Sequence, residues 1–183
     1  GEWRPNSVLF QNLNFQASQT KYKHTEFDAG QAGTVFANQG HDIRVQARHQ
    51  AWRTNHGAWE GVWGWQTEQA QFSADGAEAF APFSKTRTQA LFAIEEFTTG
   101  KASFNVGLRR EQVSVESLGN PDPTVDRFEI GSRKFAPQSW AASTAWQVMP
   151  QWRLSANVSR TERAPKDYEL FANGPHIATA AWE

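Results

Sequence analysis

Four residues of the chain have the types and spacing that could bind a metal cation. His24, Glu26 and Asp28 alternate along one polar stretch, and His176 lies in a turn near the end of the chain. Side chains two residues apart on a β-strand share a face and lie roughly 6–7 Å apart, so the first three could reach one ion. Mixed imidazole and carboxylate ligands suit divalent transition metals. The alternatives are a solvated strand end for the first three residues and a structural loop role for His176.

The sequence contains no arrangement typical of a catalytic site. Glu95 and Glu96 are adjacent, so in a strand they point to opposite faces and cannot act as a carboxylate pair. Nucleophile-elbow, zinc-protease and phosphate-binding glycine-loop motifs are absent. Cys is absent as well, which removes thiolate and disulfide chemistry. We therefore expect neither enzymatic activity nor a resident cofactor.

The chain combines a polar average with many large aromatic residues. Its 183 residues include 9 Trp and 13 Phe, yet the mean hydropathy is -0.66. No run of 18 apolar residues could form a transmembrane helix, and the net charge of -1 argues against a nucleic-acid partner. An outer-membrane barrel reconciles these properties, because its apolar side chains face lipid while its lumen stays polar.

Alternation of polar and apolar residues predicts an all-β, antiparallel up-and-down meander of about seven strands. The expected strands cover residues 7–23, 34–53, 60–73, 87–97, 102–116, 139–148 and 152–163. Short connections at 54–58, 98–101 and 149–151 alternate with mostly longer ones at 29–33, 74–86, 117–138 and after 164. Tight periplasmic turns and longer extracellular loops are typical of an outer-membrane barrel.

The clearest strands place apolar and polar side chains on opposite faces. In residues 102–112, Phe104 and Leu108 fall on one face and Asn105 and Arg109 on the other. The polar face should line the lumen and contact a plug domain. The lumen candidates are Arg44, Arg48, Arg109, Glu111 and Arg153. The pattern leaves the faces of 60–73 and 87–97 open.

Four tryptophans flank two of the short connections. Trp52 and Trp59 bracket the first, and Trp146 and Trp152 bracket the third. The amphipathic indole ring prefers the boundary between membrane and water, so we expect a girdle in which all four point outward at one level. The alternative is the general preference of Trp for β-strands.

The C-terminal stretch carries a more specific motif. Arg163, Ala164 and Pro165 are followed by Glu169–Gly174, and then by His176, Ala178 and Thr179. This stretch resembles a segment of the TonB-dependent outer-membrane receptors, in which Arg-Ala-Pro and Glu-Leu-(Phe/Tyr)-Ala-Asn-Gly-x-His-x-Ala-Thr end a barrel strand. A second set of residues upstream also resembles this family, and the two sets together are similar to a branch linked to zinc or haem-type cargo. The upstream set comprises Tyr22–Phe27, Gly33-Thr34 and Asn38–Gly40.

The resemblance implies a location in the Gram-negative outer membrane and a barrel of about 22 strands closed by a separate plug domain. Residues 1–183 are then expected to be part of the barrel domain, with the plug, the TonB box and the other strands outside them. The implied function is TonB-energised uptake of a scarce nutrient, with zinc, an iron chelate or haem as cargo. The implied partners are outer-membrane lipid, the plug and the TonB complex.

Two other functions remain open from the sequence. One is a passive porin or structural barrel, which would lack a plug. The other is a soluble, Trp-rich β-sandwich that binds glycans, which would dissolve without detergent.

Overall fold

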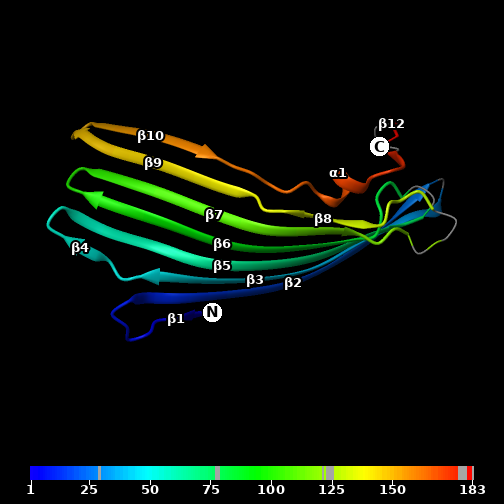
Figure 1. Ribbon diagram of the computed structural model, residues 1–183, viewed down its shortest axis with the longest axis horizontal. Coiled ribbons are helices and arrows are strands. Elements are labelled where there is room, and N and C mark those ends of the chain that lie inside the picture. The colour runs from blue at the N-terminus through cyan, green and yellow to red at the C-terminus, as the bar shows by residue number, and fades with distance from the viewer. Residues whose placement is uncertain (29, 77–78, 121, 123–125, 177–180, 183) are drawn as a thin grey trace.

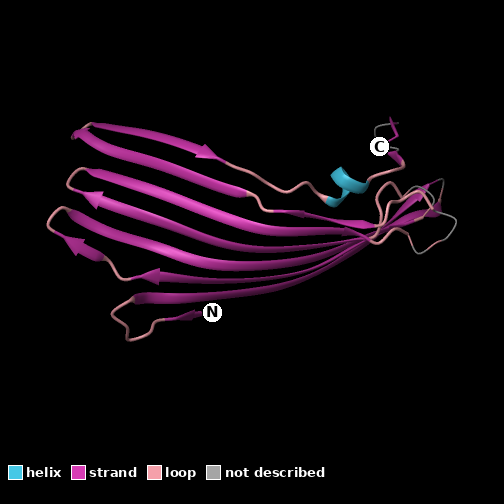
Figure 2. Cartoon of the chain, in the orientation of Figure 1, coloured by secondary structure: helices cyan, strands magenta, loops and turns pink. Residues whose placement is uncertain are grey.

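The computed structural model describes residues 1–28, 30–76, 79–120, 122, 126–176 and 181–182, and it is dominated by one antiparallel sheet (Figures 1 and 2). Its strands are β1 (Glu2–Trp3), β2 (Phe10–Asp28), β3 (Gln31–His49), β4 (Trp52–Thr54), β5 (Gly57–Asp75), β6 (Ser84–Thr99), β7 (Ala102–Ser117), β8 (Gly131–Phe135), β9 (Gln138–Met149) and β10 (Trp152–Arg160). The long strands pair in chain order, while β4 pairs beside β5 and β8 beside β7. Helix α1 (Asp167–Phe171) and the hairpin of β11 (Pro175–His176) and β12 (Ala181–Trp182) follow.

The predicted all-β meander is confirmed, and the seven expected strands correspond to the seven long strands of the sheet. Because these strands form one meander and not two packed sheets, the sandwich alternative is wrong. The three short turns expected from the sequence gather at one end of the sheet, and the long β5–β6 and β7–β9 connections lie at the other (Figure 1).

Several predicted boundaries are wrong. The strand expected over 34–53 ends at His49, and Trp52–Thr54 forms the separate strand β4. The connection expected at 29–33 is a tight turn, since β3 already begins at Gln31 and Gly30 has a left-handed φ of 83°. The long connection 117–138 contains β8, and the last strand stops at Arg160 instead of 163.

The register gives each long strand an inner and an outer face. We call inner the face on which α1 packs, through contacts with Val113 and Val115. The outer face carries an apolar band. The band also crosses β5 and β6, whose faces the sequence left open, because the opposed pairs Trp65–Leu91 and Trp63–Ala93 lie on the outer face. The band comprises Leu13, Phe15, Ala17, Ile43, Val45, Ala47, Trp59, Trp63, Trp65, Leu91, Ala93, Phe97, Phe104, Val106, Leu108, Trp140, Ala142, Trp146, Leu154, Ala156 and Val158.

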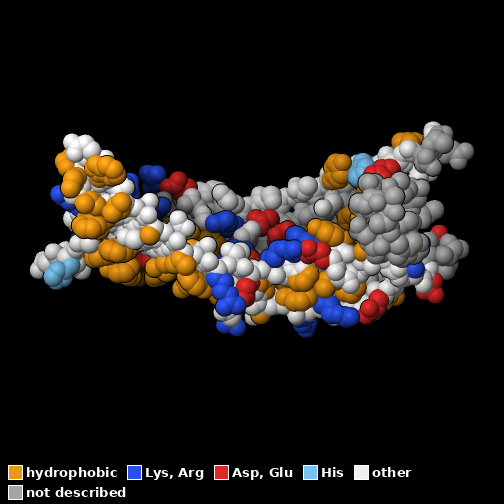
Figure 3. All heavy atoms as spheres, turned by 90° about the horizontal axis from the view of Figure 1, so that it is seen from above, with side chains coloured by type: hydrophobic (Ala, Val, Ile, Leu, Met, Phe, Trp, Pro, Cys, Tyr) orange, Lys and Arg blue, Asp and Glu red, His pale blue; other side chains and the backbone are white. Residues whose placement is uncertain are grey.

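This distribution is the reverse of a soluble protein. Outer side chains such as Leu91 and Leu108 are 65% and 57% exposed, whereas inner polar residues such as Arg109 and Glu111 are partly buried. In the space-filling view, hydrophobic side chains gather along the lower edge of the molecule toward the short-turn end (Figure 3). An exposed apolar band of this extent fits a lipid environment.

On the inner face, the Phe92 ring occupies the space that a side chain at position 64 would need, and position 64 is a glycine. Phe92 lies opposite Gly64, and a Cβ atom on Gly64 would lie 2.7 Å or less from three atoms of the Phe92 ring. The guanidinium carbons of Arg44 and Arg109 lie 4.6 Å and 5.8 Å from the ring centroid. Phe92 is therefore held between backbone and two cations, and is only 9% exposed.

We predict that Gly64→Ala destabilises the folded barrel by about 1–3 kcal/mol, because the added methyl group must displace the Phe92 ring. Gly107→Ala is the matched control, since Gly107 is on the same face and a Cβ there has no atom within 4 Å. The folded fraction can be followed in detergent by heat-modifiable migration on gels. Equal unfolding temperatures for the two variants would contradict the prediction.

Candidate functional site: a pocket beneath a folded-over segment

Residues 161–174, which we call the strap, continue from the end of β10 toward the long-loop end of the sheet, where α1 contacts β7 and β6 (Figure 1). Pro165 cannot donate a ladder hydrogen bond, so the strand cannot continue there. Two bonds of 2.6 Å join the Arg163 guanidinium to the Glu169 carboxylate, and the Lys166 backbone N–H donates to Glu169 at 2.7 Å. Glu169 thus fixes both the approach to α1 and its first turn.

The strap is anchored to the sheet by apolar and polar contacts. Phe171 is 4% exposed and packs with Val113 and Val115 of β7. The Ser84 hydroxyl of β6 donates to the Asp167 carboxylate, and the Asn173 N–H donates to the Phe80 carbonyl at 2.9 Å. The sequence predicted a structured loop here but not its packing against the sheet.

The ion pair gives the strap a pH dependence. Hydrogen bonds from Arg163 and from the Lys166 N–H lower the pKa of Glu169 from 4.5 to about 2. The stabilisation is therefore complete above about pH 4.5 and is lost as the pH falls toward 2.

We predict that a spin label on Tyr168→Cys becomes mobile between about pH 4.5 and 2. Tyr168 is an exposed position on α1, and these 183 residues contain no Cys, so the label is unique within them. In a Glu169→Gln background the label should already be mobile at pH 7 and show no transition. A transition that is the same in both backgrounds would assign it to another group.

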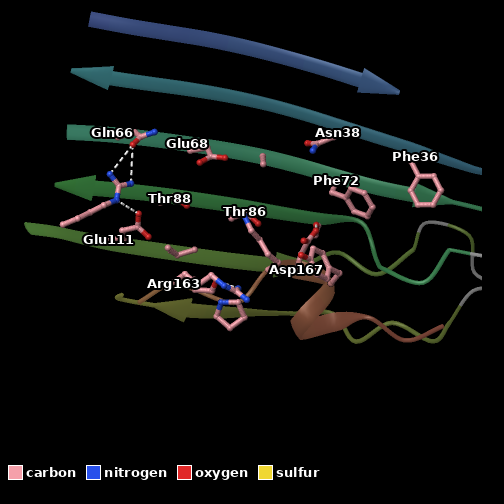
Figure 4. Close-up of a pocket in the computed structure, with 18 of the residues that line it drawn as sticks. Phe36, Asn38, Gln66, Glu68, Phe72, Thr86, Thr88, Glu111, Arg163 and Asp167 are labelled. Atoms are coloured by element: carbon pink, nitrogen blue, oxygen red, sulfur yellow. Dashed lines mark hydrogen bonds and ion pairs between the residues drawn. The ribbon is translucent and has the colours of Figure 1, made fainter. Parts of the chain in front are cut away.

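Between the strap and the sheet lies a pocket of about 660 Å³ (Figure 4). Phe36 and Phe72 line it from β3 and β5, and Arg163 and Asp167 line it from the strap. Its remaining lining is largely polar and includes Gln66, Glu68, Thr86, Thr88, Arg109, Glu111 and Lys166. The pocket therefore combines aromatic rings with charges of both signs.

A chain of hydrogen bonds runs along the pocket floor. The Gln66 amide donates to Asp42 at 2.7 Å and accepts from the Arg109 guanidinium at 3.3 Å. Arg109 also donates to Glu111 at 2.7 Å. The four side chains come from β3, β5 and β7, so the floor is cross-linked over several strands.

The register places the five lumen candidates on the inner face. Arg44 and Arg109 contact Phe92, and Arg48 lies 4.0 Å from Glu60. Arg153 is exposed at the short-turn end of β10. A contact between these side chains and a plug stays a prediction.

Two of the four cation-binding candidates can be described. The His24 Nε2 lies 3.8 Å from the Glu26 carboxylate, and the His24 ring stacks on Phe36 at 5.0 Å between centroids. The side chains of Asp28 and His176 lie outside the described part of the structure. Among the described residues, no three His, Cys, Asp or Glu side chains come close enough to hold a metal ion.

Three of the four girdle tryptophans have outer positions by register. Trp52 lies opposite Trp59 near the first short turn, and Trp146 lies opposite Leu154 near the third. Trp152 is 66% exposed, but the register shifts between Trp152 and Arg153, so pairing does not fix its face.

A polar cluster on the outer face escaped the sequence analysis. Glu95 lies within the apolar band, where its carboxylate accepts from the Trp63 indole at 2.6 Å and meets His49 Nε2 at 3.1 Å. His49 is 2% exposed, its Nδ1 meets the Gln50 carbonyl at 2.7 Å, and its ring stacks on Trp52. In the sequence, Glu95 is two residues from both Ala93 and Phe97, so a charge at an apolar-face position could have indicated this cluster. The sequence left the faces of this strand unassigned, so the indication could not be used.

The helix that the structure describes is too short and too polar to cross a membrane. The sheet, with its apolar outer face, its polar inner face and long connections gathered at one end, has the architecture of an outer-membrane barrel wall. Residues 1–182 match the family model described as TonB dependent receptor-like, beta-barrel. The chain belongs to this family, whose members reside in the Gram-negative outer membrane and act as transporters, not enzymes.

Proposed function

We propose that the receptor containing this barrel takes up a scarce nutrient that carries a metal, either as a free ion or as a chelate or haem. TonB-dependent uptake follows from the family, in which a plug domain and the TonB complex generally couple transport to energy. The proposal for the cargo is supported by the likeness of the His24 and His176 segments to a branch that handles such cargo.

The pocket beneath the strap carries the proposal further. Its volume of about 660 Å³ lies within the range of small-molecule sites, so a chelate or haem fits it better than a bare ion does. The rings of Phe36 and Phe72 can contact a flat organic ligand, and Arg109 and Arg163 can pair with its carboxylates.

His24 contacts one of the residues that line this pocket. Its ring stacks on Phe36, a lining residue, and its Nδ1 is buried without a hydrogen-bond partner among the described residues. An imidazole in this position could ligate the metal of a bound cargo.

The test is equilibrium binding of haem, a ferric chelate and zinc to the intact receptor in detergent. We expect haem or the chelate to bind, and Phe36→Ala to weaken that binding at least tenfold. Phe15→Ala is the matched control, because Phe15 lies in the outer apolar band, and it should leave binding unchanged.

His24→Ala and His176→Ala, made separately and together, test the metal ligands. Unchanged affinity in the double variant would remove both residues from the cargo site. Failure of all three cargoes to bind would overturn the metal-containing cargo, while uptake in cells lacking TonB would overturn the coupling.

A further inference from the structure

The border of the apolar band crosses the outer face obliquely. On β2 and β3 the band reaches Ala17 and Ile43, which lie opposite each other. On β5 and β6 the band ends at Trp65 and Leu91, which is one outward-facing residue pair nearer the short turns. On β7 and β9 it ends at Leu108 and Trp140, one more outward-facing pair nearer the short turns. A steady shift of this kind is expected of strands that tilt across a bilayer.

Cationic side chains lie one to three outer positions beyond this border on the loop side. By register, seven outer positions there carry Lys or Arg; Arg160 pairs with Glu162 at 2.6 Å, and we call the other six the basic belt. The basic belt consists of Lys21, Lys23, Lys85, Arg87, Arg110 and Lys134. All but the half-buried Lys85 are exposed.

The basic belt has little negative charge around it. Within the described residues, none of its six cations has a carboxylate within 4.0 Å. The outer carboxylates on the same side are Glu116, opposite Lys85, and Asp75 nearer the loops. The outer positions between the cations are mostly uncharged and include Gln39, Gln69, Gln71, Gln89, Gln112 and Ser114.

The spacing of the cations suits a ligand with more than one anionic group. Lys85 and Arg87 are two residues apart on one face, so they lie roughly 7 Å apart along the strand. Arg87, Ser114 and Lys134 occupy one cross-strand row, which places the two cations roughly 10 Å apart.

We propose that the basic belt binds the phosphorylated headgroups of anionic lipids in the membrane leaflet on the long-loop side. A cation just beyond the apolar band lies at headgroup depth, where phosphate is the complementary charge. Lys and Arg both pair strongly with phosphate oxygens, and the intervening amides can donate further hydrogen bonds. This proposal does not depend on which cargo the receptor carries.

The experiment measures binding of a fluorescent lipid A with two phosphates to the intact receptor in dodecyl maltoside micelles. We expect Lys85→Gln/Arg87→Gln to weaken binding about thirtyfold, about 2 kcal/mol, as expected for two cations near a charged lipid surface. Arg53→Gln/Lys101→Gln removes the same charge types at the short-turn end and should change affinity less than twofold. Lipid A with one phosphate should bind the wild type more weakly.

Three results would overturn the proposal. They are equal losses in the two double variants, no binding by the wild type, or displacement of the lipid by millimolar inorganic phosphate, which would indicate a site for free phosphate. If Lys85→Gln/Arg87→Gln does not fold, as judged by heat-modifiable migration, Lys21→Gln/Lys23→Gln serves as the belt variant and carries the same expectation.

Discussion

Replacing Glu95 with alanine should destabilise the folded barrel by about 3 kcal/mol, whereas Glu95→Gln should be nearly neutral. Alanine removes the acceptor shared by the Trp63 indole and His49, and both groups lie where little water can replace it. Because the His49 Nδ1 proton is directed to the Gln50 carbonyl, the contact between Nε2 and Glu95 must contain a second proton. His49 and Glu95 are therefore joined by a hydrogen bond that the alanine variant loses.

A glutamine amide reproduces this arrangement with neutral partners. Its oxygen can accept from Trp63, and its NH₂ can donate to the unprotonated Nε2 of His49. Glu96→Ala is the control, since Glu96 is adjacent in sequence but lies on the inner face opposite Glu60. Urea unfolding of the receptor in lipid vesicles measures all three variants. Equal losses for Glu95→Ala and Glu96→Ala would show that the cluster does not stabilise the barrel.

Phe171→Ala should release the strap from the sheet at a cost of about 3–4 kcal/mol in docking free energy. Phe171 is the buried member of α1 and packs with Val113 and Val115, while Ala164 and Leu170 of the strap pack around this cluster and are only partly buried. Released, the strap exposes Arg163 and Lys166 to trypsin while the strands stay protected. We expect cleavage there to rise at least a hundredfold, and cargo binding to fall because one wall of the pocket is gone.

Tyr168→Ala provides the comparison on the same helix. Tyr168 is half exposed, so its removal should change cleavage only slightly. If both variants are cut at the wild-type rate, the strap is held by its hydrogen bonds and not by Phe171.

The sequence predicted the meander because most strands obey a simple two-residue alternation. It left β5 and β6 open because their patterns are mixed. Glu95 lies among outward apolar residues, and Ile94 lies on the inner face opposite Gly107. Only the pairing with neighbouring strands, each with its own clear parity, settles which face is which.

The site was harder to predict than the fold. Val113 and Val115 are apolar residues on the otherwise polar inner face of β7. Their position is explained by the strap, which covers them. The Arg-Ala-Pro motif indicated where β10 ends, but the direction of the strap depends on contacts with residues more than 50 positions earlier in the chain. Such long-range contacts leave no local pattern.

The position of Glu95 has a consequence for how the barrel assembles. Its carboxylate is satisfied by Trp63 on the adjacent strand β5, and by His49 on β3, one strand further away. A β5–β6 hairpin that entered lipid alone would carry a carboxylate with only one of its two partners. Insertion of β6 is therefore favoured when β3, β5 and β6 are already paired in register. The three strands would then enter the bilayer as one unit, and a mispaired β3 would delay the insertion of all three.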